Sequence, residues 1–214
     1  MSEPYVLARE GSLWVLDKPA GFAAHETGDP SVPDVVTWAI EHAGAPPSLA
    51  PIHRLDRETS GVLLCSDDPE LRARLGGRFA RGEVKKTYRA LVHGRTHGKG
   101  IVRRPLIDRR RGRPVPALTR WRRLAVYGRV SLLEVRPETG RAHQIRRHLQ
   151  GIGHPVVGDE RYPPKRFLAV AGFPGRLWLH ASSIEIEGLR YEAPLPPELA
   201  AHLALLEAKL SGAA

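Results

Sequence analysis

A carboxylate set among arginines is the part of this sequence best suited to chemistry. Residues 53–61 read His-Arg-Leu-Asp-Arg-Glu-Thr-Ser-Gly, so Asp56 lies between Arg54 and Arg57 and precedes a turn and an apolar run at 62–64. Neighbouring cations favour the ionised form of a carboxylate. An ionised, sheltered carboxylate can act as a nucleophile or a base, and arginines can hold phosphate groups. The run therefore suggests chemistry on a nucleic acid.

Positive charge is concentrated in one segment of the chain. The 214 residues carry a net charge of +10, and residues 101–150 contain 14 arginines, no lysine and three acidic residues. Such a concentration is the expected electrostatic footprint of a polyanion partner, although a solvated arginine-rich loop is the alternative interpretation. We favour the nucleic acid. The candidate contacts to an RNA backbone in this segment are Arg109, Arg110, Arg111 and Arg113.

Composition limits the other classes of function. The single cysteine, Cys65, excludes an internal disulfide framework, argues against a cysteine-based metal site and is expected to be a buried structural thiol. No stretch approaches the roughly 18–20 apolar residues of a membrane span, and the N-terminus lacks the features of a signal peptide. We therefore expect a cytoplasmic protein that does not engage a membrane.

The elements that must position these residues are read from periodicity and from turn residues. Helices are predicted at 31–43, at 69–81 between the cap Asp68 and the closing Gly82, at 141–150 and at 197–210. Strands are predicted at 12–17, 61–66, 84–93 and 130–135, with a further pair at 177–180 and 184–186. Residues 94–116 are expected to form a long loop or irregular hairpin. The predicted fold class is α/β of the α+β type, with a mixed, largely antiparallel sheet flanked by helices.

Four blocks together resemble the RluA-type pseudouridine synthase family. Residues 53–61 resemble its active-site motif, and residues 17–21 (Asp-Lys-Pro-Ala-Gly) its N-terminal block. In that block Lys18 is expected to support the turn, and a plain surface lysine is the alternative interpretation. Residues 86–94 resemble its tyrosine-bearing strand. Residues 136–149, followed by 154–159, resemble its arginine-bearing helix and the next loop. The resemblance implies the catalytic fold of that family, with a central basic cleft.

The same resemblance implies isomerisation of uridine in RNA to pseudouridine, with no cofactor. Asp56 matches the essential aspartate, which acts at the sugar either as a nucleophile at C1′ or by removing the C2′ proton. Tyr88 matches the tyrosine that stacks on the target base and can help to remove the C5 proton. Arg146 matches the arginine that pairs with the catalytic carboxylate. Arg54 matches a residue that holds or displaces the flipped nucleotide.

Further residues of these blocks are candidates for substrate binding. They are His53, Arg57, Arg141 and Gln144. No metal site is expected, because His143 and His148 are five residues apart and miss the helical spacing of a zinc pair.

The expected partner is RNA, either transfer RNA or ribosomal RNA. Only 52 residues precede the key motif, and a strand, a turn and a helix already use them. We therefore expect residues 1–214 to form a single catalytic domain without an N-terminal S4 domain, acting as a monomer. The alternative is a non-catalytic RNA-binding or ribosome-assembly factor on the same fold. The trio of Asp56, Tyr88 and Arg146 favours the enzyme, because binding alone would not require it.

Overall fold

The chain divides into two compact units. The computed structural model describes residues 3–108, 112–166 and 169–211. The first unit comprises Met1–Lys86 and Ala181–Pro194, and the second comprises Thr87–His180 and Leu195–Ala214. Among the described residues, no helix is both long and apolar enough to cross a membrane.

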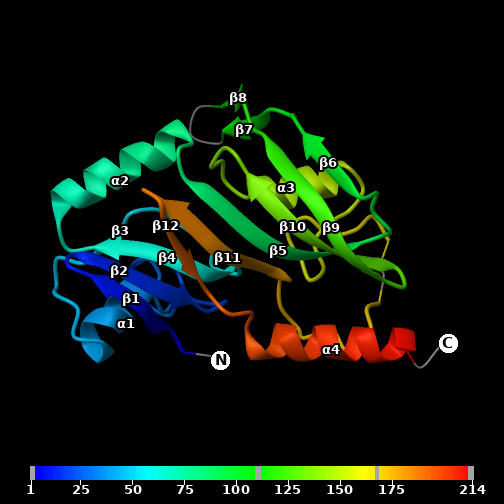
Figure 1. Ribbon diagram of the computed structural model, residues 1–214, viewed down its shortest axis with the longest axis horizontal. Coiled ribbons are helices and arrows are strands. Elements are labelled where there is room, and N and C mark those ends of the chain that lie inside the picture. The colour runs from blue at the N-terminus through cyan, green and yellow to red at the C-terminus, as the bar shows by residue number, and fades with distance from the viewer. Residues whose placement is uncertain (1–2, 109–111, 167–168, 212–214) are drawn as a thin grey trace. The chain divides into compact units, whose positions relative to one another are not determined.

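The first unit is a sheet with helices packed on it (Figure 1). Its strand order is β1-β2-β4-β11, with β3 paired to β4 and β12 paired to β11. The pairings β1–β2, β2–β4, β3–β4 and β11–β12 are antiparallel. The elements are β1 (Tyr5–Glu10), β2 (Leu13–Lys18), α1 (Val35–His42), β3 (Ala50–Pro51), β4 (Ser60–Ser66), α2 (Pro69–Arg81), β11 (Leu179–Ile186) and β12 (Leu189–Glu192).

Helices cover both faces of this sheet, which explains why every residue of β2 and β4 is buried. Successive side chains of a strand point to opposite faces. The face toward α2 gathers Leu13, Val15, Val62 and Leu64 around Leu75. The face toward α1 gathers Trp14, Leu16, Leu63 and Cys65 around Val35 and Ala39. Cys65 is fully buried, as predicted, and burial raises the pKa of its thiol.

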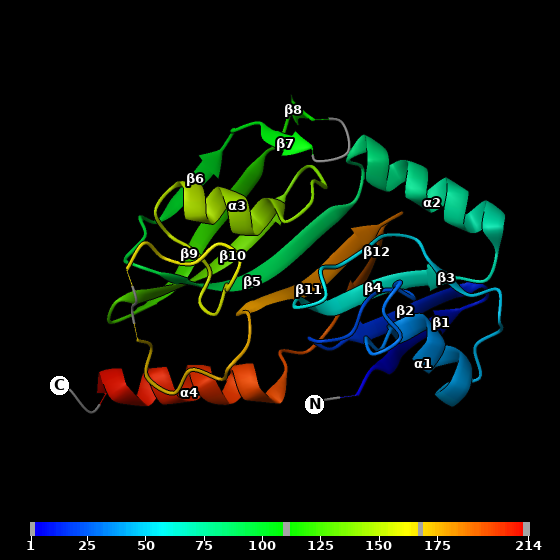
Figure 2. The ribbon, with the colours of Figure 1, turned by 180° about the vertical axis from the view of Figure 1, so that it is seen from behind.

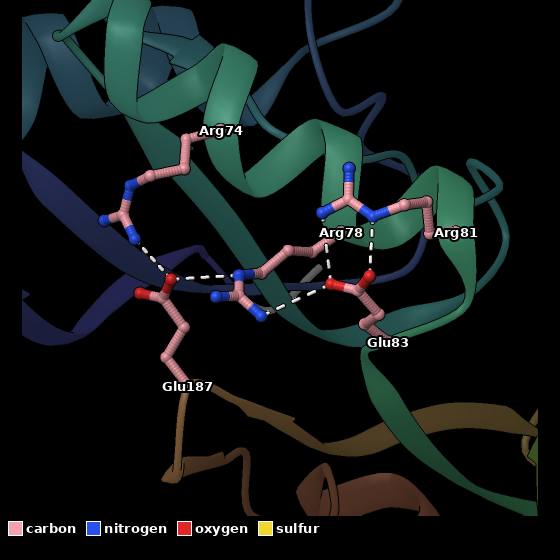
Figure 3. Close-up of polar contacts among 5 residues, drawn as sticks. All are labelled: Arg74, Arg78, Arg81, Glu83 and Glu187. Carbon is pink, nitrogen blue, oxygen red and sulfur yellow. Dashed lines mark hydrogen bonds and ion pairs between the residues drawn. The ribbon is translucent and has the colours of Figure 1, made fainter.

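Helix α2 begins and ends where the sequence predicts. The Asp68 side chain accepts the backbone N–H of Glu70 at 2.8 Å, and Gly82 closes the helix in the left-handed conformation. On the exposed side of α2, an alternating network joins three arginines to two glutamates (Figure 3). Its members are Arg74, Arg78 and Arg81 of the helix, Glu83, and Glu187 of the turn between β11 and β12. The network ties α2 to that turn.

The second unit is a sheet in the order β5-β10-β9-β6, with a separate two-stranded hairpin of β7 and β8. The pairings of β10 with β5 and β9, of β6 with β9 and of β7 with β8 are antiparallel. The elements are β5 (Lys85–His93), β6 (Lys99–Val102), β7 (Leu106–Asp108), β8 (Arg113–Val115), β9 (Thr119–Tyr127), β10 (Val130–Pro137), α3 (Gln144–Gly151) and α4 (Pro197–Ser211).

One hydrophobic core holds the second unit together. Helix α3 packs on β9 and β10 through Ile145 and Leu149 (Figure 2). Helix α4 adds Leu199 and Leu206 to the same core. The predicted fold class is confirmed, since antiparallel strand pairs flanked by helices make up both units.

Several predicted elements are wrong in detail. Residues 94–116 do not form a long loop, because they contain β6, which pairs with β9, and the hairpin of β7 and β8, so the alternative of an irregular hairpin is the better prediction. The two strands predicted at 177–180 and 184–186 are the single strand β11, and the sequence does not predict β1, β3, β9 or β12. Helix α1 begins at Val35, since Asp34 accepts the Thr37 N–H and caps it. The missed strands share a cause: short strands are defined by partners distant in sequence, and local pattern does not reveal those partners.

We expect Gly61→Ala to prevent the first unit from folding. Gly61 has φ of +119°, and a Cβ atom there would lie 2.1 Å from the carbonyl oxygen of Ala181. The unfolding free energy should fall by more than about 3 kcal/mol, or no folded protein should form. Gly11→Ala is the control, because Gly11 has φ of +56° with nothing within 4 Å of the added atom. Its cost should be about 1–2 kcal/mol in chemical denaturation. Equal losses of unfolding free energy in the two variants would show that the close approach of residue 61 to Ala181 does not determine the stability of the unit.

Candidate active site

Asp56 lies on the loop between β3 and β4, at the start of a tight turn. Its carbonyl oxygen accepts the N–H of Thr59 at 3.0 Å, one residue before β4 begins. Leu55 is buried and anchors the loop, whereas Arg54 and Arg57 are exposed and Asp56 is half-buried. The loop therefore presents its two guanidinium groups to solvent on either side of the carboxylate residue.

A buried lysine holds this turn from behind. Lys18, at the end of β2, has no exposed surface, and its ammonium donates to the carbonyl oxygens of Pro19, Phe22 and Arg57 at 2.9, 2.8 and 3.1 Å. The Arg57 oxygen also accepts the N–H of Gly21 at 2.9 Å. An ammonium has three donors, and three carbonyl dipoles here replace the water that burial removes. The block at 17–21 is thereby tied to the residue that follows Asp56.

His53 fixes the other end of the loop. Its Nε2 accepts the backbone N–H of Leu64 at 3.1 Å, and its ring stacks on Phe79 of α2 with 4.5 Å between centroids. Burial lowers the pKa of His53 to about 3, and the positive charge of Lys86 adds to this effect. The ring is therefore neutral at pH 7, with its proton on Nδ1. A neutral, stacked ring positions the loop, a role that the sequence does not reveal.

A hollow of about 290 Å³ lies beside the loop within the first unit. Both arginines that flank Asp56 line it, and its other walls are small or apolar apart from the imidazole of His25. The lining residues are Ala23, Ala24, His25, Thr27, Val32, Arg54, Leu55 and Arg57. Cationic groups at an apolar hollow suit a nucleotide, which carries both a base and a phosphate.

Tyr88 and Arg146 belong to the second unit. Tyr88, on β5, is opposite Val135 of β10 and packs against the hydrophobic core, which fixes its ring. Arg146, on α3, is only 3% exposed. The Arg146 side chain is therefore enclosed by the protein rather than solvated. Its Nε and Nη2 donate to Oδ2 and Oδ1 of Asp159, each at 2.8 Å. A buried guanidinium requires such a partner.

Gln144 is buried at the first position of α3 and uses its whole amide within the protein. Its Nε2 donates to the carbonyl oxygen of Leu118 at 2.9 Å and to Oγ1 of Thr119 at 3.0 Å. Its Oε1 accepts the Thr139 hydroxyl at 2.6 Å and the Arg141 N–H at 3.1 Å. Two donors and two acceptor sites are the full capacity of an amide. Gln144 therefore holds the start of α3 against β9.

Of the remaining predicted residues, the two that the structure describes are surface arginines. Arg141 is exposed, and its Nε donates to the carbonyl oxygen of Pro116 at 3.0 Å. Arg113 is exposed at the start of β8. Arg109, Arg110 and Arg111 lie outside the described residues. Asp56, Arg54, Arg57 and His53 share one loop of the first unit. The approach of Arg146 and Tyr88 to Asp56 stays a prediction.

The partner of Arg146 is not among the residues that the sequence predicts for a functional role. Asp159, the partner of Arg146, is the last residue of the block at 154–159, and its place in that block is the only signal that the sequence offers. Its distance of 13 residues from Arg146 hides the pairing.

We expect Lys18→Met to destabilise the first unit by about 3 kcal/mol, because three inward carbonyl oxygens lose the ammonium that donates to them. Chemical denaturation measures this loss. Lys85→Met is the matched control, since the Lys85 side chain is 75% exposed and pairs with Glu185. Its loss should stay below about 1 kcal/mol. Equal losses would contradict the anchoring role of Lys18.

The half-buried, neutral His53 should make stability depend on pH. The folded pKa of about 3 lies below the ordinary value of 6.5, so the unfolded chain binds the proton first on acidification. The contribution is complete above pH 6.5 and is lost as the pH falls toward 3. We expect His53→Gln to flatten the fall in unfolding free energy between pH 6.5 and 4, by up to about 1.4 kcal/mol per pH unit. Urea denaturation at several pH values checks this, and an unchanged slope would contradict it.

Known proteins that are similar to this chain are named as pseudouridine synthases. Residues 12–151 match the family model described as RNA pseudouridylate synthase. An uncharacterized RNA pseudouridine synthase of Zymomonas mobilis is 36% identical over 89% of this chain and 93% of its own length. Ribosomal large subunit pseudouridine synthase D of Nitrosomonas europaea is 34% identical over 92% of this chain, which spans 64% of that relative. tRNA pseudouridine synthase C of Salmonella typhimurium is 32% identical over 85% of this chain and 79% of its own.

Solved structures agree on the fold. Human RNA Pseudouridylate Synthase Domain Containing 4 superposes with a TM-score of 0.79 at 24% identity, covering 94% of this chain and 92% of that one. Human RNA Pseudouridylate Synthase Domain Containing 1 gives a TM-score of 0.73 at 25% identity, covering 94% and 87%. The resemblance of the four sequence blocks is thus confirmed along most of the chain, and this protein belongs to the RNA pseudouridylate synthase family.

Proposed function

We propose that this protein isomerises specific uridines to pseudouridine in structured RNA, with Asp56 as the catalytic carboxylate. One observation carries the proposal. The motif at 53–61, in a member of this family, places Asp56 on a loop pinned by the buried Lys18 and flanked by two exposed arginines. Pinned backbone keeps a reacting group in place, and exposed guanidinium groups can hold the phosphates around it.

The proposed chemistry is balanced within the substrate. The bond between N1 and C1′ breaks, the base turns, and a bond forms between C5 and C1′. The C5 proton is lost, and N1 gains one. Asp56 acts either as the nucleophile at C1′ or as the base that takes the C2′ proton, and both routes require it to be ionised. In this proposal no cofactor or metal is needed, because the reaction has no net oxidation and consumes no second substrate.

Two residues of the second unit are proposed to act on the same nucleotide. Tyr88 stacks against the base and can help to remove the C5 proton, and its ring is already held by the core. Arg146 pairs with the Asp56 carboxylate and keeps it charged. Arg54 and Arg57 hold the flipped nucleotide beside the hollow that they line. His53 and Gln144, both committed to contacts within the protein, are proposed to act by positioning.

The RNA itself is proposed by class. Relatives are named for ribosomal RNA and for transfer RNA, so both are candidate substrates. Exposed Arg113 and Arg141, with Arg109, Arg110 and Arg111, are proposed backbone contacts. Reaction in the cytoplasm, by a monomer, completes the proposal. The alternative is an RNA-binding or ribosome-assembly factor without catalysis. Such a factor would not require the family's motif around Asp56.

Tritium release from [5-³H]uridine-labelled RNA tests the proposal, because the product has the same mass as the substrate. Wild type should release tritium from unmodified ribosomal or transfer RNA. Asp56→Asn should release none, a loss of at least about 10³-fold, while its RNA affinity in filter binding stays the same. Asp68→Asn is the matched control and should keep full activity, because asparagine caps α2 as well as aspartate does.

Two outcomes would contradict the proposal. Equal release by wild type and Asp56→Asn would remove Asp56 from the chemistry. No release by wild type from either RNA pool, despite salt-sensitive RNA binding, would support the non-catalytic alternative.

A further inference from the structure

We infer that Asp159 is a positioning residue for the reaction. It holds the Arg146 guanidinium by one edge, so that the terminal edge of the same group is set for a second anion. The inference rests on the proposed function, in which that second anion is the Asp56 carboxylate.

The contact between Arg146 and Asp159 is a side-on fork. The Nε and Nη2 of Arg146 reach the two carboxylate oxygens at 2.8 Å each. The two side chains are 4% and 0% exposed. Two parallel hydrogen bonds fix both the plane and the direction of a guanidinium, which a single bond does not. Because the pair is buried, water does not compete for either partner.

Asp159 is itself fixed before any substrate arrives. Its Oδ1 also accepts the backbone N–H groups of Arg161 and Tyr162, at 3.1 and 2.9 Å. The preceding residue, Gly158, packs so closely that a Cβ atom would lie 2.3 Å from the carbonyl oxygen of Arg176. The backbone on both sides of Asp159 thus determines where its carboxylate lies.

An aromatic ring covers the same guanidinium. The centroid of Tyr162 lies 5.4 Å from Cζ of Arg146, within the range of a cation–π contact. The Tyr162 ring also meets the ring of His143 edge-on, with 5.7 Å between centroids, and His143 immediately precedes α3. Tyr162 therefore connects the start of the helix to the guanidinium that the helix carries.

In this arrangement the two edges of the Arg146 guanidinium have different roles. A guanidinium has five N–H donors, and Asp159 engages one on Nε and one on Nη2. The other three, on Nη1 and Nη2, form a terminal fork that matches a carboxylate or a phosphate. Asp159 also neutralises the buried charge of Arg146, so Arg146 does not depend on the second anion to remain inside the protein. The fork is in place in advance, which lowers the entropy lost when the reacting groups meet.

Steady-state kinetics of tritium release, with RNA affinity measured separately, distinguishes positioning from a purely structural ion pair. Asp159→Asn should lower kcat by roughly 10–100-fold, the scale of a misplaced reacting group. The KM and the RNA Kd should not change, because the pair does not hold RNA. Asp159→Glu keeps the charge but shifts the fork by one methylene, and it should give an intermediate kcat. Assays are run at a temperature at which circular dichroism shows each variant folded.

A second ion pair of the same unit supplies the matched control. Arg176 and Glu198 form an ion pair with 2.8 Å between nitrogen and oxygen. Neither residue belongs to the sequence blocks that resemble the family's motifs. Glu198→Gln should lower the unfolding temperature without changing kcat. If Asp159→Asn does not fold, the kcat of Asp159→Glu alone tests the inference.

Two results would overturn the inference. One is a folded Asp159→Asn or Asp159→Glu variant with the kcat of wild type. The other is a variant in which only KM and the RNA Kd change. A wild type that releases no tritium would instead reject the proposed function, and so the two failures are distinguishable.

Discussion

The buried ammonium of Lys18 is the constraint on which the Asp56 loop depends. It donates hydrogen bonds to the carbonyl oxygens of Pro19, Phe22 and Arg57, which take the place of water around the charge. These bonds join the end of β2 to the residue after Asp56. The loop cannot shift without exposing that charge to an apolar interior, which is costly. His53 fixes the other end of the loop through Leu64 and α2. Polar contacts thus hold the loop, while its two arginines remain at the surface.

The same principle governs Arg146 in the second unit. Both of these buried cations have partners within the protein: backbone carbonyl oxygens for Lys18 and a carboxylate for Arg146. Groups arranged in this way need no rearrangement when the substrate binds, and preorganised charges stabilise a developing charge better than water does. The Arg–Glu network on α2 is different in kind, because it is exposed and contributes little free energy.

The sequence predicted the parts of this molecule that depend on local chemistry. Asp68 and Gly82 delimit α2 because a side-chain cap and a left-handed glycine act within one turn. The identity of the motif residues and the fold class were also predictable, the former by resemblance. The burial of Arg146 was not, because its partner Asp159 lies 13 residues away and the intervening loop brings them together. Nor was β6, which is a strand only because β9 pairs with it.

The most direct test of this account is a crystal structure of the protein bound to RNA that carries 5-fluorouridine at the target position. We expect a flipped target nucleotide with its C1′ or C2′ in contact with the Asp56 carboxylate. The terminal edge of Arg146 should engage that carboxylate, while Asp159 keeps the other edge. A nucleotide bound with its ribose away from Asp56, or an Arg146 that leaves Asp159 on binding, would contradict it.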